Sequence, residues 1–259
     1  MFRIAYLLNH GDKAYRKILH LRSVAHILPA PCVTPNRTRM SRLLLPLIFL
    51  VFTACSARFS KQHLLVIGDS NAVGKGWVDQ LQQLRGGGPL VNTALSGNTI
   101  GFNYGSEMSM NTLENLTSYL RQGYAEMGQI DEVIIALGTN DCKARFGGQH
   151  GNIITNLTTL TKRTRDFFTS RGQEVPRIVL VSPPPMASDE VVIDEFTGGA
   201  ACVAELTEAV KALATREGYC FVNLLEQPGS TLLSNSEDGI HFSLEGDRLI
   251  AQSVIKTCY

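Results

Sequence analysis

From Leu64 onward, apolar residues fall into short runs that alternate with longer segments of helical spacing. The runs are rich in Val, Ile and Leu, a composition that indicates buried β-strands. We expect strands at residues 64–67, 90–94, 133–137, 178–181 and 220–224. The spacing of apolar side chains between them predicts helices at residues 77–84, 153–167, 200–217 and 244–257.

Alternating strands and helices predict one α/β domain over residues 63–259, built as a three-layer α/β/α sandwich around a five-stranded parallel sheet. In open sheets of this class, ligands bind at the carboxyl ends of the strands. The residues that follow each strand are therefore the first place to look for chemistry.

Residues 40–55, MSRLLLPLIFLVFTAC, have the pattern of an export signal. Arg42 precedes an apolar run that is too short to span a bilayer and matches a secretory signal core. The small residues before Cys55 resemble a bacterial lipobox, so we expect this cysteine to be lipidated, with residues 56–62 as a tether. A plain membrane anchor or an unlipidated signal peptide are the alternatives.

Residues 1–39 precede this signal and are either an over-extended reading frame, with the true start at Met40, or a disordered lead. The expected location is the cell envelope, with a lipid anchor and the domain facing the periplasm. Ser56 after the cysteine favours the outer membrane.

Charge is distributed unevenly along the chain. The first 54 residues carry eight of the 24 Lys and Arg but only one of the 23 Asp and Glu, which leaves the remainder at a net charge of −6. An acidic domain argues against nucleic acid or anionic lipid as its partner. The oligomeric state stays open.

Four cysteines follow the signal: Cys142, Cys202, Cys220 and Cys258. An oxidising envelope permits disulfides, and four cysteines allow three pairings. A Cys220–Cys258 bond with Cys142–Cys202 as its complement is plausible, and four reduced thiols are the alternative. The chain has no CxxC or HExxH pattern, so we expect no metal and no cofactor.

Four polar clusters fall at the same end of the predicted sheet. They are Gly68-Asp69-Ser70-Asn71, Leu95-Ser96-Gly97-Asn98, Gly138-Thr139-Asn140-Asp141 and Asp238-Gly239-Ile240-His241. Ester cleavage by a serine requires a neutral imidazole beside the hydroxyl, a carboxylate that orients the imidazole, and donors for the oxyanion.

Ser70 is the candidate nucleophile, His241 its base and Asp238 the orienting carboxylate. The backbone N–H groups of Ser70 and Gly97 and the side-chain amide of Asn140 are the candidate oxyanion donors. The alternative for the first cluster is that Ser70 is only a helix cap and Asp69 a turn residue, and we interpret Asp141 as structural.

These four clusters, in this order, resemble the blocks of the SGNH (GDSL) hydrolase family over about residues 64–255. The segments GTNDCKARF, VSPPPMA and DEFTGGAA are similar to the arylesterase/acyltransferase branch. The resemblance implies a flavodoxin-like fold and the same catalytic roles for Ser70, His241 and Asp238. Asn71 and Cys142 depart from the pattern of that branch and leave the shape of the acyl pocket open.

The expected function is a metal-free serine esterase that hydrolyses or transfers short acyl groups of small esters or acylated sugars. A lysophospholipase or thioesterase for longer chains is the alternative within the enzymes. A non-catalytic envelope lipoprotein that uses the fold for binding is the alternative outside them. No GxSxG is present, which argues against the α/β-hydrolase class.

Overall fold

The computed structural model describes residues 59–259. Residues 1–39, the signal segment with Cys55, and the first part of the tether lie outside the described residues. The predicted five-stranded parallel sheet is confirmed, with the strand order β2-β1-β3-β4-β5. The strands are β1 Leu64–Gly68, β2 Leu90–Asn92, β3 Glu132–Ala136, β4 Arg177–Val181 and β5 Cys220–Val222. The second and fifth strands are shorter than predicted.

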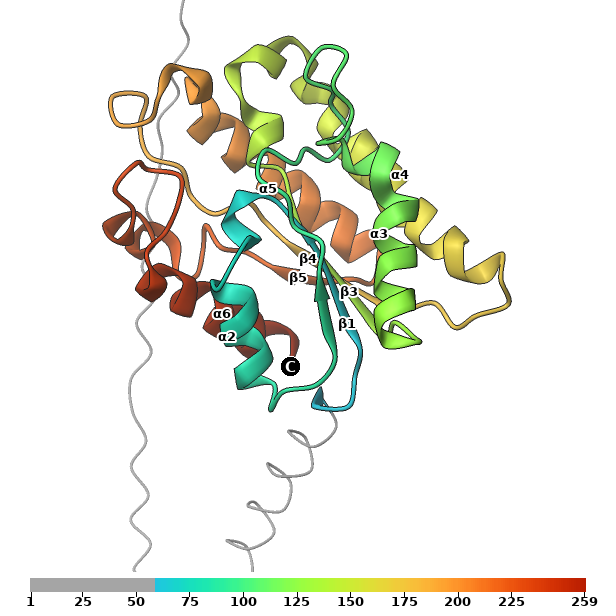
Figure 1. Ribbon diagram of the computed structural model, residues 1–259. Helices are drawn as coiled ribbons and strands as arrows, with labels where there is room; N and C mark the ends of the chain where they lie inside the picture. Colours follow the sequence, from blue (N-terminus) through green and yellow to red (C-terminus); the bar gives the residue numbers. More distant parts are fainter. Residues whose placement is uncertain (1–58) are drawn as a thin grey trace, which may run out of the picture. The chain divides into compact units, whose positions relative to one another are not determined.

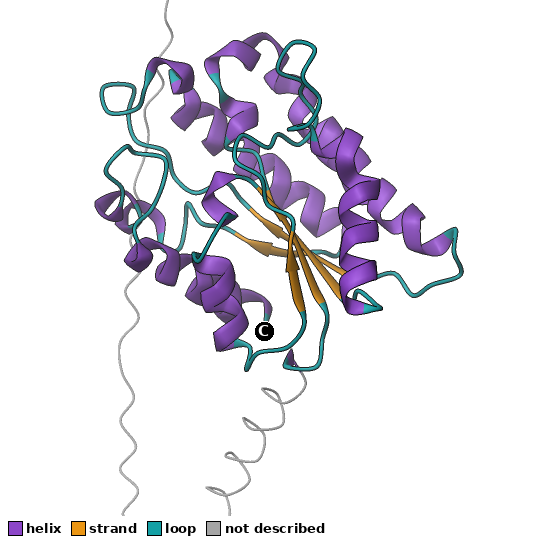
Figure 2. Cartoon of the chain, in the orientation of Figure 1, coloured by secondary structure: helices purple, strands orange, loops and turns teal. Residues whose placement is uncertain are grey.

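Helices cover both faces of the sheet and complete the predicted three layers (Figures 1 and 2). The α-helices are α2 Trp77–Leu84, α3 Thr112–Met127, α4 Ile153–Thr169, α5 Gly199–Glu217 and α6 Leu244–Cys258. Short 3₁₀ helices follow the strands: η1 Ser70–Ala72, η2 Asn140–Cys142, η3 Ala144–Asn152, η4 Asp194–Phe196, η5 Gly229–Thr231 and η6 Leu233–Asn235.

Helix α3 is an addition to the sequence-based prediction. Its buried side is a narrow row that includes Leu116 and Leu120, and most of its other residues are polar. Asn111 caps its first turn by accepting the Leu113 N–H, and Gly128 ends it in the left-handed conformation. The narrow apolar row explains why the pattern alone did not reveal this helix.

The core has one layer on each side of the sheet, because successive residues of a strand point to opposite faces. Leu65 and Ile67 of β1 pack with α3, α4 and α5, whereas Leu64 and Val66 pack with α2 and α6. Both faces of β1 are therefore buried, which fixes its register with β2 and β3.

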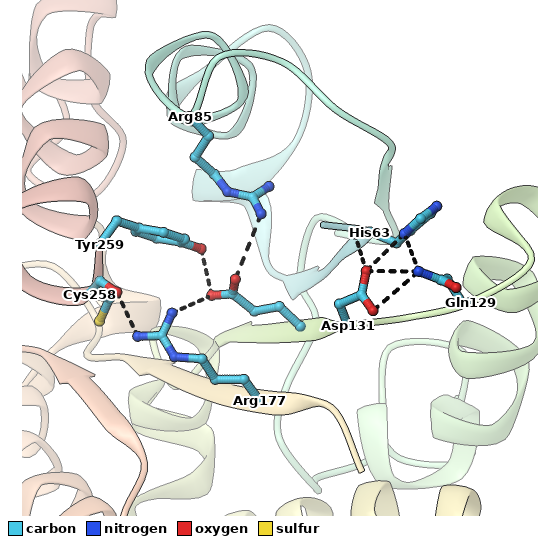
Figure 3. Close-up of polar contacts among 8 residues, drawn as sticks. His63, Arg85, Gln129, Asp131, Arg177, Cys258 and Tyr259 are labelled. Atoms are coloured by element: carbon cyan, nitrogen blue, oxygen red, sulfur yellow. Dashed lines mark hydrogen bonds and ion pairs between the residues drawn. The ribbon is translucent and has the colours of Figure 1, made fainter. Parts of the chain in front are cut away.

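A buried charge cluster joins the amino end of the sheet to the last residue of the chain (Figure 3). Glu132 lies 3.7 Å from Arg85 and 3.4 Å from Arg177, and accepts a hydrogen bond of 2.5 Å from the Tyr259 hydroxyl. The side chains of Arg85 and Glu132 are 0% and 1% exposed. Burial raises the pKa of Glu132, and hydrogen bonding to Tyr259 opposes that rise. The cluster holds the end of α6 at the amino end of the sheet.

Two disulfides join the four cysteines of the described chain. Cys142–Cys202 connects η2 to α5, near the carboxyl ends of the strands. Cys220–Cys258 connects β5 to the end of α6. Within residues 59–259, no helix combines the length and apolar content needed to cross a bilayer.

Candidate active site

The turn after β1 presents Ser70 at the carboxyl end of the sheet. Ser70 begins the short helix η1, and Asp69 caps it by accepting the Asn71 N–H at 3.0 Å. A Cβ at Gly68 would lie 2.6 Å from the Cβ of Ala72, so only glycine lets the chain turn this tightly. Ser70 is left partly exposed at the start of the helix.

Ser70, His241 and Asp238 form one continuous hydrogen-bonded chain. The Ser70 Oγ lies 2.9 Å from His241 Nε2, and His241 Nδ1 lies 2.7 Å from Asp238 Oδ2. These residues come from opposite ends of the domain sequence and meet because β1 and the loop before α6 reach the same edge of the sheet. The arrangement gives a hydroxyl, a base and an orienting carboxylate in reacting order.

The loop that carries His241 is held in a tight turn. Gly239 has φ +76°, and a Cβ there would lie 2.5 Å from the Cβ of Ala187. The carbonyl of Gly239 accepts the Ala187 N–H at 3.0 Å. The loop after β4 thus supports the turn and keeps the imidazole directed at Ser70.

Asp238 is ionised over the whole working range of pH. Its partial burial disfavours the charge, but hydrogen bonds from the His241 amide and ring and from the Ile240 amide outweigh this effect and lower the pKa of Asp238 to about 2. The His241 amide donates to Asp238 Oδ1 at 2.8 Å, while the ring faces Oδ2. A fixed carboxylate of this kind favours the tautomer with the proton on Nδ1, which leaves Nε2 free to accept from Ser70.

The three candidate oxyanion donors lie on the segments that follow β1, β2 and β3. Gly97 is the third residue of a turn in which the Asn98 N–H donates a hydrogen bond to the Leu95 carbonyl at 3.0 Å. The φ angle of Gly97 is +83°. Among residues 59–259, no protein acceptor takes the N–H of Ser70 or of Gly97. The Asn140 Nδ2 donates one hydrogen to the Asn98 carbonyl at 3.0 Å, and an amide nitrogen has a second hydrogen to donate.

Asp141 joins two of the loops that carry these donors. Its fully buried carboxylate accepts the Ile100 N–H at 2.9 and 3.0 Å, so the loop after β3 holds the loop after β2. Burial raises the pKa of Asp141 to about 7, against the opposing effect of the backbone hydrogen bonds. Asn98 adds a second link, because its Nδ2 donates to the Gly68 carbonyl at 3.0 Å. Sequence reasoning gave Asn98 no role; its position beside the LSG block was the available signal.

Asp69 lies directly beside the nucleophile and is only 2% exposed. Burial raises the pKa of Asp69 to about 6, although the Asn71 N–H, the Thr139 side chain, and the charges of His241 and Lys143 favour its ionised form. Asp69 therefore caps the η1 turn and also places a carboxyl group within electrostatic range of His241.

An open hollow of about 330 Å³ lies beside His241 and Asp238. Asn235, Glu237 and Phe242 contribute an amide, a carboxylate and an aromatic ring to its lining.

In the described part of the chain, no group of three or more His, Cys, Asp or Glu side chains has an arrangement that would hold a metal ion. His63 lies away from the candidate active site and pairs with Asp131 near the amino end of the sheet (Figure 3).

Comparison with solved structures agrees with this architecture. A carbohydrate acetylesterase from Sinorhizobium meliloti superposes with a TM-score of 0.65 at 24% identity, covering 76% of this chain and 97% of that one. An aryl esterase from M. smegmatis superposes with a TM-score of 0.64 at 25% identity, and the match covers 76% of this chain and 99% of that one. A variant of an acetyl-xylooligosaccharide esterase from Geobacillus superposes with a TM-score of 0.57 at 18% identity, and the match covers 78% of this chain and 97% of that one. No curated protein sequence matches the chain at a significant level.

The model of the GDSL-like lipase/acylhydrolase family matches residues 66–249, which include all four polar clusters and most of the described domain. The chain therefore belongs to the GDSL-like lipase/acylhydrolase family and is a carboxylic ester hydrolase.

Proposed function

We propose that this enzyme hydrolyses short acyl esters through an acyl-enzyme on Ser70, with His241 as the base and Asp238 as its orienting carboxylate. The observation that carries the proposal is the hydrogen-bonded chain from Ser70 Oγ through both ring nitrogens of His241 to Asp238, with distances of 2.9 and 2.7 Å. Apo enzymes often have looser contacts than these between a nucleophile and its base.

In the first half of the reaction, Ser70 Oγ attacks the ester carbonyl carbon while its proton moves to His241 Nε2. The oxyanion is stabilised by the N–H groups of Ser70 and Gly97 and by the Asn140 amide. The intermediate then collapses, the carbon–alkoxy bond breaks, and the leaving alcohol takes the proton from His241.

In the second half, water attacks the acyl carbon and gives a proton to His241. Collapse of this second intermediate releases the carboxylic acid and returns the proton to Ser70 Oγ. An alcohol that replaces water at this step gives acyl transfer through the same intermediate, and the rate of each route depends on access to the acyl-enzyme.

The substrate that we propose is a small ester or an acylated sugar. The hollow beside His241 supports this choice on the alcohol side, because its amide, carboxylate and aromatic ring suit a polyhydroxyl group. The similarity to the M. smegmatis aryl esterase, at 25% identity, supports a small ester as the substrate.

The experiment is hydrolysis of 4-nitrophenyl esters from acetate to palmitate by the full chain, beside Ser70→Ala. Loss of the nucleophile should lower kcat by roughly 10⁴-fold or more. Fast cleavage of acetate and butyrate by the wild type alone supports the proposal. Preference for long chains would favour lipid turnover, and equal rates for both proteins on every ester would overturn the catalytic assignment.

We also propose that Cys55 is lipidated and holds the enzyme in the envelope, facing the periplasm from the outer membrane. This rests on the signal pattern of residues 40–55, since Cys55 lies outside the described residues. Mass spectrometry of the N-terminal peptide, from wild type and Cys55→Ser made in a Gram-negative host, tests it. An unmodified wild-type peptide would refute it.

A further inference from the structure

The proposed oxyanion donor on the loop after β2 is the backbone N–H of Gly97. Because glycine is the most flexible residue, other contacts must hold this N–H in position. Glycine has more backbone freedom than any other residue, and Gly97 has φ +83°, which other residues rarely adopt. A Cβ at this position would lie 2.6 Å from the Met110 sulfur, so a stiffer residue has no room. The position of the Gly97 N–H must therefore be fixed by contacts from outside the turn.

Tyr104 makes the side-chain contact that fixes Gly97 directly. Its hydroxyl donates to the Gly97 carbonyl at 2.9 Å, from the far part of the same loop. Burial raises the pKa of Tyr104 above its ordinary value, so the hydroxyl remains a hydrogen-bond donor at every pH at which the enzyme would be assayed. This bond restrains the peptide that follows Gly97, and with it the direction of the Gly97 N–H.

Lys143 holds Tyr104 in turn. It comes from the loop after β3, is only 8% exposed, and places its Nζ 5.1 Å from the centroid of the Tyr104 ring. On the other side, the same Nζ lies 5.2 Å from the Phe196 ring and 3.0 Å from Glu195 Oε1, both in η4 of the loop after β4. One buried cation thus connects three of the loops that form the catalytic end of the sheet.

A buried ammonium is costly unless it has partners, and here those partners lie on separate loops. If any of the three loops moved away, Lys143 would lose a ring or its carboxylate. The contacts therefore favour a single arrangement of the loops, and in that arrangement the Tyr104 hydroxyl reaches Gly97.

We infer that Tyr104 is a positioning residue that holds the Gly97 oxyanion donor, and that Lys143 acts through Tyr104 by clamping its ring between the loops. The inference rests on the proposed serine esterase mechanism. Neither side chain touches the reacting atoms, and their effect is on the placement of a backbone donor whose preorganisation sets the rate.

The first test is Tyr104→Phe in the full chain, which removes the hydroxyl and keeps the ring over Lys143. We expect kcat for 4-nitrophenyl acetate to fall about tenfold, the scale of one hydrogen bond, with KM within twofold of wild type. Tyr124→Phe is the matched control, since it makes the same change on an exposed part of α3 and should leave kcat unchanged.

A transition-state analogue separates positioning from general destabilisation. A trifluoromethyl ketone forms a hemiketal oxyanion with the serine, so its Ki should rise by the same factor as kcat falls in Tyr104→Phe. An uncharged ether of similar shape lacks the oxyanion, and its Ki should not change. Equal weakening of both inhibitors, or unchanged binding of the ketone, would overturn the inference.

The link through Lys143 is tested by a double-mutant cycle. Lys143→Met should lower kcat by several-fold. Lys143→Arg keeps the charge and should therefore lower kcat less than Lys143→Met does. In the Tyr104→Phe background, Lys143→Met should cause little further loss of kcat. Fully multiplicative effects would show that Lys143 acts independently and would overturn that part.

The wild type and Ser70→Ala distinguish failure of this inference from failure of the proposed function. If both proteins are equally inactive on every ester, the mechanism fails and the inference fails with it. If activity depends on Ser70 but Tyr104→Phe keeps wild-type kcat, only the inference fails.

Discussion

Replacing Asp238 by Asn should almost abolish activity while leaving the fold intact. Asp238 Oδ1 accepts the amides of Ile240 and His241 at 2.9 and 2.8 Å, so in the variant we expect the side-chain oxygen to keep these bonds. The new NH₂ group then takes the place of Oδ2, which lies 2.7 Å from His241 Nδ1.

A donor at that position forces His241 into the wrong tautomer. Nδ1 must accept from the amide, so the ring proton moves to Nε2, which lies 2.9 Å from Ser70 Oγ. A protonated Nε2 donates to the serine and has no lone pair to take its proton. In a serine protease, the corresponding change lowers kcat by about 10⁴-fold, or about 5.4 kcal/mol in the barrier, and we expect a similar loss.

The assay is kcat/KM for 4-nitrophenyl acetate, with the melting temperature measured on the same samples. Because the Asp238 side chain is 48% exposed, its loss should cost little stability. Glu208→Gln is the control, since it neutralises an exposed carboxylate of α5 that is not part of the hollow. An Asp238→Asn variant that keeps more than a tenth of wild-type activity would refute the tautomer argument.

Three further predictions concern stability and the packing around the site. Removing either disulfide, Cys142–Cys202 or Cys220–Cys258, should lower the unfolding free energy by about 4 kcal/mol in denaturant titrations, because the sequence separations of 60 and 38 give similar loop entropies. Only loss of the first should also lower kcat, since it adjoins the Asn140 turn, and equal kcat in both variants would contradict this. Glu132→Ala should lower the unfolding free energy by about 3–5 kcal/mol, because it leaves the buried guanidinium of Arg85 without its carboxylate. The kcat of the folded variant should be unchanged, and a loss of unfolding free energy below about 1 kcal/mol would contradict a buried ion pair. The pKa of Asp141 is about 7 in the folded state, against an ordinary value of 3.8. Between these pH values the folded state binds more protons than the unfolded state, so the unfolding free energy should fall as pH rises, by on the order of 4 kcal/mol. Asp141→Asn should reduce that dependence, leaving the smaller contribution of Asp69, and an unchanged slope would show that the Asp141 carboxylate does not contribute.

The sequence alone determined the sheet and the location of the chemistry. Apolar runs such as residues 64–67 are short and rich in Val, Ile and Leu, which indicates strands buried on both faces, and alternation with helices predicts that they are parallel. The polar residues that follow each strand must then meet at one edge. The strand pattern therefore predicts one site for Ser70 and His241, although they are 171 positions apart in the sequence.

Which side chains hold that site in place depends on contacts between elements that are distant in the sequence. Helix α3 has too narrow an apolar row to be recognised from its spacing. The contacts of Asp141 with the Ile100 amide, of Tyr104 with the Gly97 carbonyl, and of Arg85 with Glu132 join residues on different loops or elements. Periodicity reports whether a local segment is buried, and it carries no information on which distant partner a buried polar group meets. That choice depends on strand order, register and the path of each loop, which exist only in the folded chain.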